Sequence, residues 1–244
     1  MYFDSKPKGW SVWPEFDHLD GQYCRNIHPN GQDIWEVDSD GNIAYHEVDK
    51  SQDVIYKVSD VDANDVDAND DSNRVKNEDG TVASVSFDYG TIHSIRDDKK
   101  DQNGNNVEFT IFKVKGDDNA ADLYNFMIDP KTNNVEWAHV ETGTDKTEKN
   151  LIGNSHDKSG SGLGSYALNE GYTIRDSDHN HPSGEPHPSE ADVDNARKIS
   201  DKFHNATLNI FTAPWQPNPY NKNSPYIHPI SPGSHIGTLH PGKP

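Results

Sequence analysis

The segment from His179 to Asp192 has the residue types and the spacing of a metal site. His179 and His181 lie two positions apart and precede Pro182, while Ser189 and Asp192 close the segment. Residues two apart on an extended chain point to the same side, so both imidazoles can reach one ion, and Pro182 ends the strand. A loop rich in Pro and Gly can return the chain, and a helix beginning at Ser189 would hold Asp192 in its first turn. Two imidazoles and one carboxylate leave the fourth position of a tetrahedral zinc ion open, as in catalytic sites.

A zinc ion bound in this way needs a proton carrier before it can support hydrolysis. Such an ion lowers the pKa of water to about 7 and polarises a carbonyl oxygen. Glu136 lies in the mostly apolar run 134–140, where a carboxylate is costly unless the protein uses it, and Glu141 is the alternative acid/base. Ser189 could donate its hydroxyl to the oxyanion of a tetrahedral intermediate, although a Ser before a helix is ordinarily only an N-cap. The pattern therefore favours zinc-assisted hydrolysis at a carbonyl group.

Several predicted elements must bring these residues together. An apolar stripe over residues 120–128, stopped by Pro130, predicts one short amphipathic helix. Ser189 has the position of a helix N-cap, which predicts a second helix to about residue 203. Strands are predicted at residues 134–140, 150–153 and 207–212, a Gly/Ser-rich loop is predicted at 159–165, and the run 172–181 leads into the histidines.

The first half of the chain is predicted to be mainly β-structure. Residues 34–37 and 43–48 are strand-like, and the Asp40-Gly41 pair between them supplies the positive φ of a hairpin turn. Spaced Asp residues here also resemble half of a calcium loop, but no Glu closes a twelve-residue loop. The acidic repeat at residues 59–73 predicts a solvated loop, with adventitious calcium binding as the alternative. Further strands are predicted at 54–58, 81–87 and 107–114, and a polar segment at 96–106 separates the last two.

Composition narrows the classes of function. The 244 residues carry a formal net charge of -19, which repels phosphate backbones and anionic membranes, so we expect neither nucleic acid nor membrane as a partner. Cys24 is the single cysteine, which excludes an intramolecular disulfide and a zinc site built from paired cysteines. Residues 1–10 lack a charged leader followed by an apolar run, and no stretch approaches the roughly 20 apolar residues of a membrane span. We expect a soluble chain without a signal peptide.

The motif His-Asn-His-Pro-Ser-Gly, followed by Pro-Ser and Asp, resembles the JAMM motif of JAB/MPN metalloproteases, and its residues are most similar to those of the RadC-like branch. It is also similar to the JAB-like toxin domains at the C-termini of bacterial polymorphic (RHS-type) toxins, and residues 134–137 and 152–156 share that similarity. Residues 38–58 resemble the segment that often precedes such a domain. The match is dense over about fourteen residues and sparse elsewhere.

This resemblance implies an α+β fold, with a JAB/MPN-like mixed β-sheet flanked by helices and preceded by a β-rich N-terminal region. The expected divisions are a β-rich region at residues 1–115, a zinc metallopeptidase domain at 116–213 and a Pro/His-rich tail at 214–244. The resemblance also implies roles for five residues in hydrolysis. Glu136 would be the acid/base, Ser189 the transition-state donor, and the ligands of one Zn²⁺ would be His179, His181 and Asp192.

The function implied is that of a zinc-dependent peptidase or isopeptidase, acting as the toxin domain of a bacterial polymorphic (RHS-type) effector. Its substrate would be a protein or peptide, with a ubiquitin-like conjugate as one candidate, and an immunity protein is a candidate partner. The chain would be cytoplasmic when made and then secreted or injected into a target cell. Two alternatives stay open: a noncatalytic JAB-fold binding module, and a RadC-like protein with a DNA-related role, which the negative charge disfavours.

The strand before the first histidine departs from the family pattern, because it is polar where housekeeping relatives are usually apolar. It contains Asp176 and Asp178, whose carboxylates could instead orient the histidines. His187, inside the loop, is expected to face solvent because three ligands already suffice.

Overall fold

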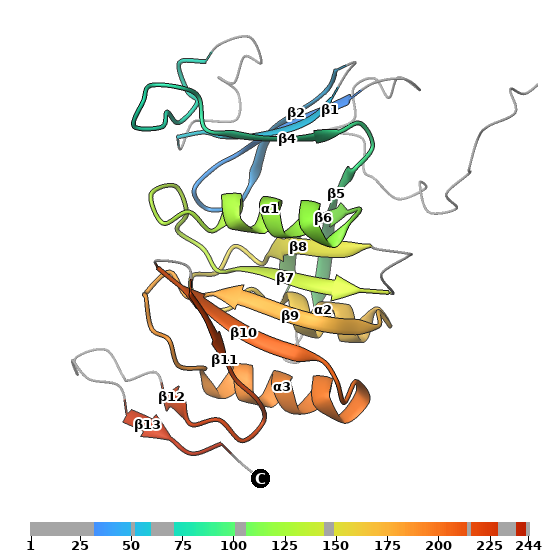
Figure 1. Ribbon diagram of the computed structural model, residues 1–244, viewed down its shortest axis with the longest axis vertical. Coiled ribbons are helices and arrows are strands. Elements are labelled where there is room, and N and C mark those ends of the chain that lie inside the picture. Colours follow the sequence, from blue (N-terminus) through green and yellow to red (C-terminus); the bar gives the residue numbers. More distant parts are fainter. Residues whose placement is uncertain are drawn as a thin grey trace, which may run out of the picture.

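The computed structural model describes residues 32–49, 52–59, 71–100, 106–143, 149–213, 216–228 and 238–242. Cys24 and most of the acidic loop predicted at residues 59–73 lie outside the described residues. The described elements form two larger sheets and three helices (Figure 1).

A four-stranded sheet with the order β2-β1-β3-β4 contains the predicted hairpin. β1 (Gln32–Val37) pairs antiparallel with β2 (Ile43–Asp49) and parallel with β3 (Gln52–Lys57), while β4 (Ser84–Asp88) pairs antiparallel with β3. The β1–β2 turn requires Gly41, whose φ of 80° is strained for a residue that carries a Cβ. The hairpin prediction is confirmed.

A seven-stranded mixed sheet with the order β11-β10-β9-β7-β8-β6-β5 carries the predicted site residues. Its strands are β5 (Ile92–Lys100), β6 (Asn106–Val114), β7 (Trp137–Thr142), β8 (Asn150–Asn154), β9 (Ile174–Asn180), β10 (Thr207–Thr212) and β11 (Gln216–Pro219). Its neighbouring strands are antiparallel except for β9 and β10, which run parallel. A small separate sheet pairs β12 (Tyr226–His228) with β13 (Thr238–His240).

Three helices flank the seven-stranded sheet. α1 (Asp117–Met127) lies between the two larger sheets, while α2 (Leu163–Asn169) and α3 (Glu190–Lys202) lie away from the four-stranded sheet (Figure 1). Because β9 and β10 are parallel, the chain between them must cross from one end of the sheet to the other, and α3 makes this crossover. The two predicted helices and the expected α+β architecture are confirmed.

Three local predictions were wrong. The polar segment at 96–106 contains the end of β5, which is an edge strand whose charged Arg96 pairs with Glu108 on β6. The Gly/Ser-rich loop at 159–165 contains the start of α2, because burial of Leu163 against the second core outweighs the poor helix propensity of its neighbours. Glu136 directly precedes β7 instead of lying inside it.

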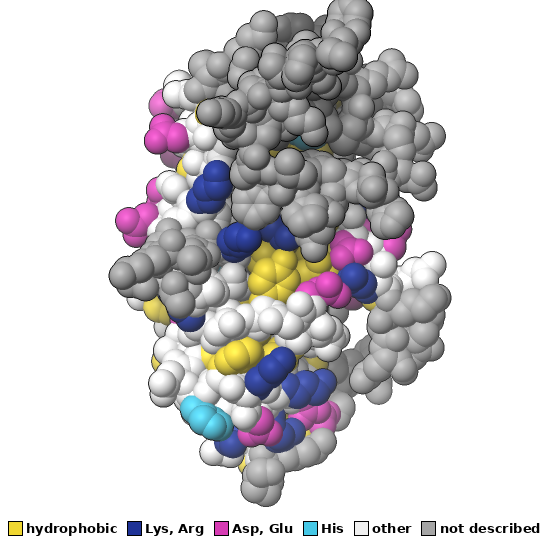
Figure 2. All heavy atoms as spheres, turned by 90° about the vertical axis from the view of Figure 1, so that its right-hand side faces the viewer, with side chains coloured by type: hydrophobic (Ala, Val, Ile, Leu, Met, Phe, Trp, Pro, Cys, Tyr) yellow, Lys and Arg dark blue, Asp and Glu magenta, His cyan; other side chains and the backbone are white. Residues whose placement is uncertain are grey.

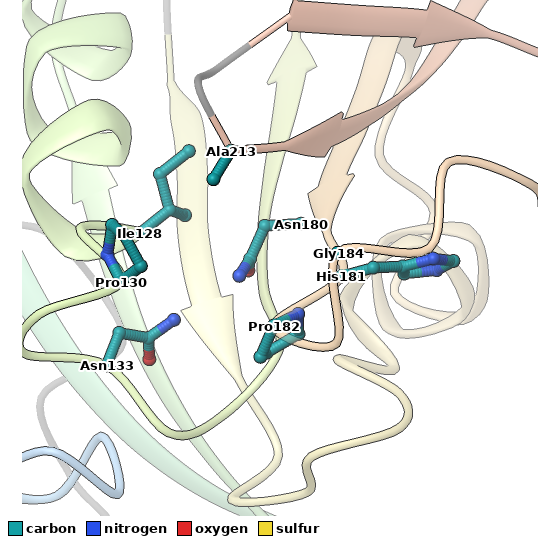
Figure 3. Close-up of a pocket in the computed structure, with 8 residues that line it drawn as sticks. All are labelled: Ile128, Pro130, Asn133, Asn180, His181, Pro182, Gly184 and Ala213. Atoms are coloured by element: carbon teal, nitrogen blue, oxygen red, sulfur yellow. The ribbon is translucent and has the colours of Figure 1, made fainter.

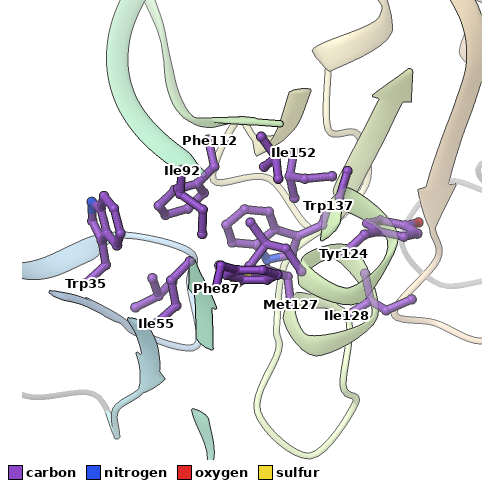
Figure 4. Close-up of a cluster of buried hydrophobic side chains, with 14 of the residues drawn as sticks. Trp35, Ile55, Phe87, Ile92, Phe112, Tyr124, Met127, Ile128, Trp137 and Ile152 are labelled. Carbon is purple, nitrogen blue, oxygen red and sulfur yellow. The ribbon is translucent and has the colours of Figure 1, made fainter. Parts of the chain in front are cut away.

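The two larger sheets share one hydrophobic core through α1 (Figure 4). Trp35 of β1 meets Phe112 of β6 edge to face, with ring centroids 6.0 Å apart, and Phe112 stacks on Trp137 of β7. The cluster also includes Ile55, Phe87, Ile92, Leu123, Tyr124, Met127, Ile128 and Ile152. The division expected after residue 115 therefore falls within a packed unit, and β5 and β6, which precede it, belong to the seven-stranded sheet.

Lys57 at the end of β3 adds a buried polar contact to this core. Its Nζ donates to the carbonyl oxygen of Met127 at the end of α1, at 3.0 Å, and lies 5.9 Å from the centre of the Trp137 ring. Burial lowers the pKa of Lys57 to about 8, although the charges of Asp129 and Asp38 oppose that shift. The four-stranded sheet is thus joined to α1 by a hydrogen bond as well as by apolar packing.

The described surface mixes both signs of charge on at least one face. Figure 2 shows Lys and Arg side chains next to Asp and Glu side chains, with hydrophobic side chains between them. Among the described helices, the longest spans 13 residues, and none has the length and apolarity to cross a membrane.

Candidate metal centre

The C-terminal end of β9 and the first turn of α3 face each other across one loop. His179 is the penultimate residue of β9, and His181 directly follows the strand. The backbone N–H of His181 still donates to the carbonyl oxygen of Phe211 on β10, at 3.1 Å, so its position remains tied to the sheet. A tight turn follows, in which Gly184 has a φ of 77° and donates to the His181 carbonyl at 2.9 Å. This turn redirects the chain toward α3.

The three predicted ligands converge at distances that suit a tetrahedral ion. The Nε2 atoms of His179 and His181 are 3.1 Å apart. Asp192 Oδ1 lies 3.4 Å from His179 Nε2, and Asp192 Oδ2 lies 3.5 Å from His181 Nε2. Ligand atoms about 2.0–2.2 Å from a tetrahedral zinc ion stand about 3.3–3.6 Å from one another. Each histidine Nε2 therefore has an Asp192 oxygen at a distance that suits a shared small divalent ion.

The loop fixes the orientation of the His181 ring. Its Nδ1 lies 2.8 Å from the carbonyl oxygen of Glu185. A carbonyl oxygen can only accept, so Nδ1 carries the proton and a neutral His181 has its lone pair on Nε2, the atom that faces His179 and Asp192. This is the arrangement in which a backbone carbonyl holds a metal-binding imidazole in its ligating tautomer.

Ser189 and Asp192 form a reciprocal cap at the start of α3. The backbone N–H of Asp192 donates to Ser189 Oγ at 3.2 Å, and the backbone N–H of Ser189 donates to Asp192 Oδ2 at 2.7 Å. Such a capping box stabilises the first turn of a helix. It also restricts the Asp192 carboxylate to the side of the helix that faces the two histidines. Ser189 is thus an N-cap in the structure, and its hydroxyl proton remains available for donation because Oγ acts here as an acceptor.

Glu136 lies next to the three predicted ligands, on the side of His179, and is almost fully buried. Its Oε1 is 4.0 Å from His179 Nε2, and the four candidate ligand atoms of the cluster all lie within 4.8 Å of one another. The backbone N–H of Ser161 donates to the same oxygen at 3.1 Å. Burial raises the pKa of the Glu136 carboxyl, with Asp192 adding to the increase and His179 opposing it. Glu136 is therefore placed beside the ligand set, at a greater distance than the ligands keep from one another.

The buried charges of the cluster are strongly coupled. Desolvation alone would lower the pKa of His179, but Asp192 and Glu136 outweigh it and raise that pKa to about 9. The pKa of Asp192 is held well below its usual range, because the two histidines outweigh the effect of its burial. Two carboxylates in so buried a place require positive charge nearby, which either a protonated imidazole or a metal ion can supply.

The other residues considered in the sequence lie elsewhere. Glu141 accepts from Arg175 at 3.0 Å, near the far end of β7. Asp178 accepts from Asn209 and faces His139, so it lies on the opposite face of β9 from the neighbouring His179, and Asp176 accepts from Thr207. The hypothesis that these aspartates orient the histidines is wrong, since the Glu185 carbonyl orients His181. His187 has a half-exposed side chain that contacts Glu185 and not the cluster.

Tyr220 is a contact of the cluster that the sequence did not reveal. It lies in the region expected to be a tail, yet it is buried, and its ring meets the His179 ring edge to face with centroids 5.7 Å apart. Burial, and after it the charges of Asp192 and Glu136, hold the pKa of Tyr220 well above its usual range. The only sequence signal for a strand next to β10 is the position of Tyr220 among polar residues. Pro217 and Pro219 weaken that signal, because proline is unfavourable inside a strand.

A small cavity of about 50 Å³ lies next to the His181 turn (Figure 3). The amides of Asn133 and Asn180 line it, together with Ile128, Pro130, Pro182, Gly184 and Ala213. The His181 ring points away from this cavity in Figure 3. Asn180 Oδ1 accepts from the backbone N–H of Trp137 at 2.7 Å, which links the end of β9 to the residue that follows Glu136.

Comparison with known families agrees with this geometry. A family model described as JAB-like toxin 1 matches residues 112–202, from β6 to the last residue of α3. The matched region includes Glu136, Ser189 and the three predicted ligands. No curated protein and no solved structure matches the chain. Over residues 112–202, the chain therefore contains a domain of the JAB-like toxin family.

Proposed function

We propose that this chain is a zinc-dependent peptidase or isopeptidase and acts as the toxin domain of a bacterial polymorphic (RHS-type) effector. The observation that carries the proposal is the convergence of His179, His181 and Asp192 at 3.1–3.5 Å, with Glu136 set behind them. Two imidazoles and one carboxylate are the donor set of a zinc site that keeps a position open for chemistry.

Each residue of the cluster has a separate task in this proposal. His179, His181 and Asp192 hold the ion, which when bound supplies a Lewis acid for the substrate carbonyl and lowers the pKa of water. Glu136 takes a proton from the attacking water and returns it to the nitrogen of the leaving amine. Its burial raises the pKa of the carboxyl toward the range in which one group can both accept and donate a proton. Ser189 donates its hydroxyl to the oxygen of the tetrahedral intermediate.

The family match supports a toxin context, and the chemistry of the site supports an amide substrate. We propose that the substrate is a protein or peptide of a target cell, with a ubiquitin-like conjugate as one candidate. An enzyme of this kind would harm its producer, so an immunity protein is the proposed partner. The net charge of -19 disfavours nucleic acid as a substrate.

Replacement of Glu136 tests the catalytic assignment. Glu136→Gln removes the proton carrier but preserves size, so we expect the variant to keep about one zinc per chain and to lose hydrolysis and toxicity by about 10²–10⁴-fold. Glu141→Gln is the matched control, since it makes the same change in β7, the strand that follows Glu136, at a partly exposed ion pair with Arg175. Activity is measured on fluorogenic peptide and isopeptide libraries, and toxicity by expression in a bacterial host.

Two outcomes would contradict the proposal in different ways. If Glu136→Gln is as active and as toxic as the wild type, Glu136 has no part in the reaction. If the wild type binds zinc but cleaves no member of either library and releases no new chain ends in a host proteome, a noncatalytic binding module is favoured instead.

A further inference from the structure

We propose that the β1–β2 turn, residues 38–42, is a positioning element for Glu136. The turn belongs to the four-stranded sheet and precedes the region that the family model matches. It contacts both chain segments that surround Glu136, while the three predicted metal ligands come from the end of β9, the residue that follows it and the first turn of α3. The catalytic consequence rests on the proposed function, but the positioning itself does not.

The first contact is with the segment that precedes Glu136 in the chain. The backbone N–H of Asn134 donates to the carbonyl oxygen of Ser39 at 2.8 Å, and the Asn134 side-chain amide donates to Ser39 Oγ, also at 2.8 Å. Asn134 is only two residues before Glu136. The turn therefore fixes the chain immediately upstream of the carboxylate by two hydrogen bonds.

The second contact is with the segment after β8. The side-chain amide of Asn154 donates to the carbonyl oxygen of Gly41 at 3.3 Å, and His156 Nδ1 lies 3.1 Å from the carbonyl oxygen of Asp40. Asn154 Oδ1 also accepts from the backbone N–H of His156 at 2.9 Å. Asn154 thus connects the turn to the start of the loop between β8 and α2, and His156 has the unusual positive φ of 56° there.

This loop makes the hydrogen bonds to Glu136. The backbone N–H of Glu136 donates to the carbonyl oxygen of Asp157 at 2.9 Å, and the backbone N–H of Ser161 donates to Glu136 Oε1 at 3.1 Å. Asp157 directly follows His156, which the turn holds. Hydrogen bonds therefore connect the turn to the start of this loop, and the loop to both the backbone and the carboxylate of Glu136.

The turn is rigid enough to act in this way. Asp38 Oδ1 accepts from the backbone N–H groups of Asp40 and Asn42, at 3.0 and 2.8 Å. Gly41 is buried, and a Cβ on it would stand 2.5 Å from the Asn154 amide nitrogen, well inside any real contact. A side chain at position 41 must therefore displace either the turn or Asn154.

The turn is expected to affect the placement of Glu136 and not metal binding. A displacement of about 1 Å in a catalytic group can reduce a rate by about 10²-fold. The described contacts of the turn include none with His179, His181 or Asp192. A change in the turn should therefore alter the placement of Glu136 and leave zinc binding intact.

Gly41→Ala in the full-length chain tests the inference, and Gly80→Ala is its matched control. Gly80 has nearly the same φ, 84°, so alanine introduces the same backbone strain, but nothing lies within 4 Å of the added Cβ. Its turn reaches the loop before Glu136 only through the exposed Glu78–Lys131 ion pair among the contacts described. The measurements are amide hydrogen exchange by NMR, zinc content, and kcat and KM on the peptide and isopeptide libraries.

We expect Gly41→Ala to speed exchange of the Glu136 and Ser161 amides at least tenfold over Gly80→Ala, with unchanged zinc content. If the chain hydrolyses a substrate, kcat should fall at least tenfold for Gly41→Ala while KM stays within twofold. Equal exchange rates at Glu136 and Ser161 in both variants would overturn the inference. Loss of zinc in Gly41→Ala, together with faster exchange throughout β9, would also overturn it. The exchange result decides the inference even if the wild type shows no hydrolysis, which would contradict only the proposed function.

A milder variant guards against a folding failure of Gly41→Ala. Asn134 is exposed, so Asn134→Ala should fold, and it removes only the amide donor to Ser39 Oγ. We expect a smaller increase, about two- to fivefold, in the exchange of the Glu136 amide. An unchanged rate in Asn134→Ala, with Gly41→Ala unfolded, would count against the turn as a positioning element.

Discussion

Ser189 combines a structural contact with a proposed catalytic one, and substitutions at this position can separate the two. Ser189 Oγ accepts from the Asp192 backbone N–H at 3.2 Å, while the bond from the Ser189 backbone N–H to Asp192 Oδ2, at 2.7 Å, does not need the side chain. Ser189→Ala therefore loses one of the two capping bonds and keeps the one that holds the ligand carboxylate. We expect every variant at this position to retain zinc.

The expected magnitudes differ between the two roles. Loss of an N-cap by substitution with Ala costs about 1 kcal/mol, whereas Gly at this position costs only a few tenths. For a chain of this size, 1 kcal/mol lowers the melting temperature by about 2–4 °C. Loss of an oxyanion donor reduces kcat by about 10²–10³-fold. Ser189→Gly and Ser189→Ala should therefore differ in stability but share the same large loss of activity, and Ser189→Thr should preserve both properties.

The assay combines thermal unfolding with initial rates on the peptide and isopeptide libraries at equal zinc content. The reasoning would be refuted if Ser189→Gly hydrolysed substrate at the wild-type rate, because the hydroxyl would then have no part in the reaction. A loss of zinc in Ser189→Gly would also refute it, since the backbone bond to Asp192 would then be insufficient to hold the carboxylate.

Three further predictions concern the surroundings of the site. Because the folded-state pKa of Lys57, about 8, lies below the ordinary lysine value of 10.5, the folded chain binds fewer protons between these values and gains stability as pH rises. The stability of wild type minus that of Lys57→Met, from urea unfolding, should thus increase by about 3 kcal/mol between pH 7.5 and 10.5, and a flat difference would contradict the buried charge. Tyr220→Phe should keep zinc and stability, whereas Tyr220→Ala should cost about 3–5 kcal/mol in thermal unfolding by removing the ring that packs on His179. Equal stability of the two variants would contradict that packing. Zinc at about 100 times its Kd should stabilise the fold by about 2.7 kcal/mol, and a chelator should reverse this effect. An unchanged melting temperature would show that zinc does not bind the folded chain in preference to the unfolded chain.

The sequence predicts that His179, His181 and Asp192 lie close together, because the relevant distances are local. His179 and His181 are fixed relative to each other by the period of a strand, and Asp192 is fixed relative to Ser189 by the capping box of one helix. One loop joins these two elements, and the turn at Gly184 reverses the chain as its composition suggests. The individual strands and helices follow from periodicity and caps, whereas the mixed sheet with flanking helices was implied by the resemblance to JAB/MPN metalloproteases.

The sequence could not show contacts that depend on distant pairing. Tyr220 reaches His179 only because β11 pairs with β10, and the two prolines in β11 make that strand look like an irregular tail in the sequence. The role of the β1–β2 turn depends on a shared core between residues far apart in the chain, such as Trp35 and Phe112. β5 was missed because an edge strand can carry charged side chains on both faces near its end, which removes the alternating pattern.

Zinc content is the most direct test of the central claim, that His179, His181 and Asp192 bind one metal ion. Purified wild-type chain is equilibrated with zinc, freed of excess metal, and analysed by inductively coupled plasma mass spectrometry beside His179→Ala and His187→Ala. His187 is the matched control because it is a half-exposed histidine of the same loop that contacts Glu185 and not the cluster. We predict about one zinc per chain for the wild type and for His187→Ala, and none above background for His179→Ala. A wild type without zinc, or equal zinc in all three proteins, would contradict the account.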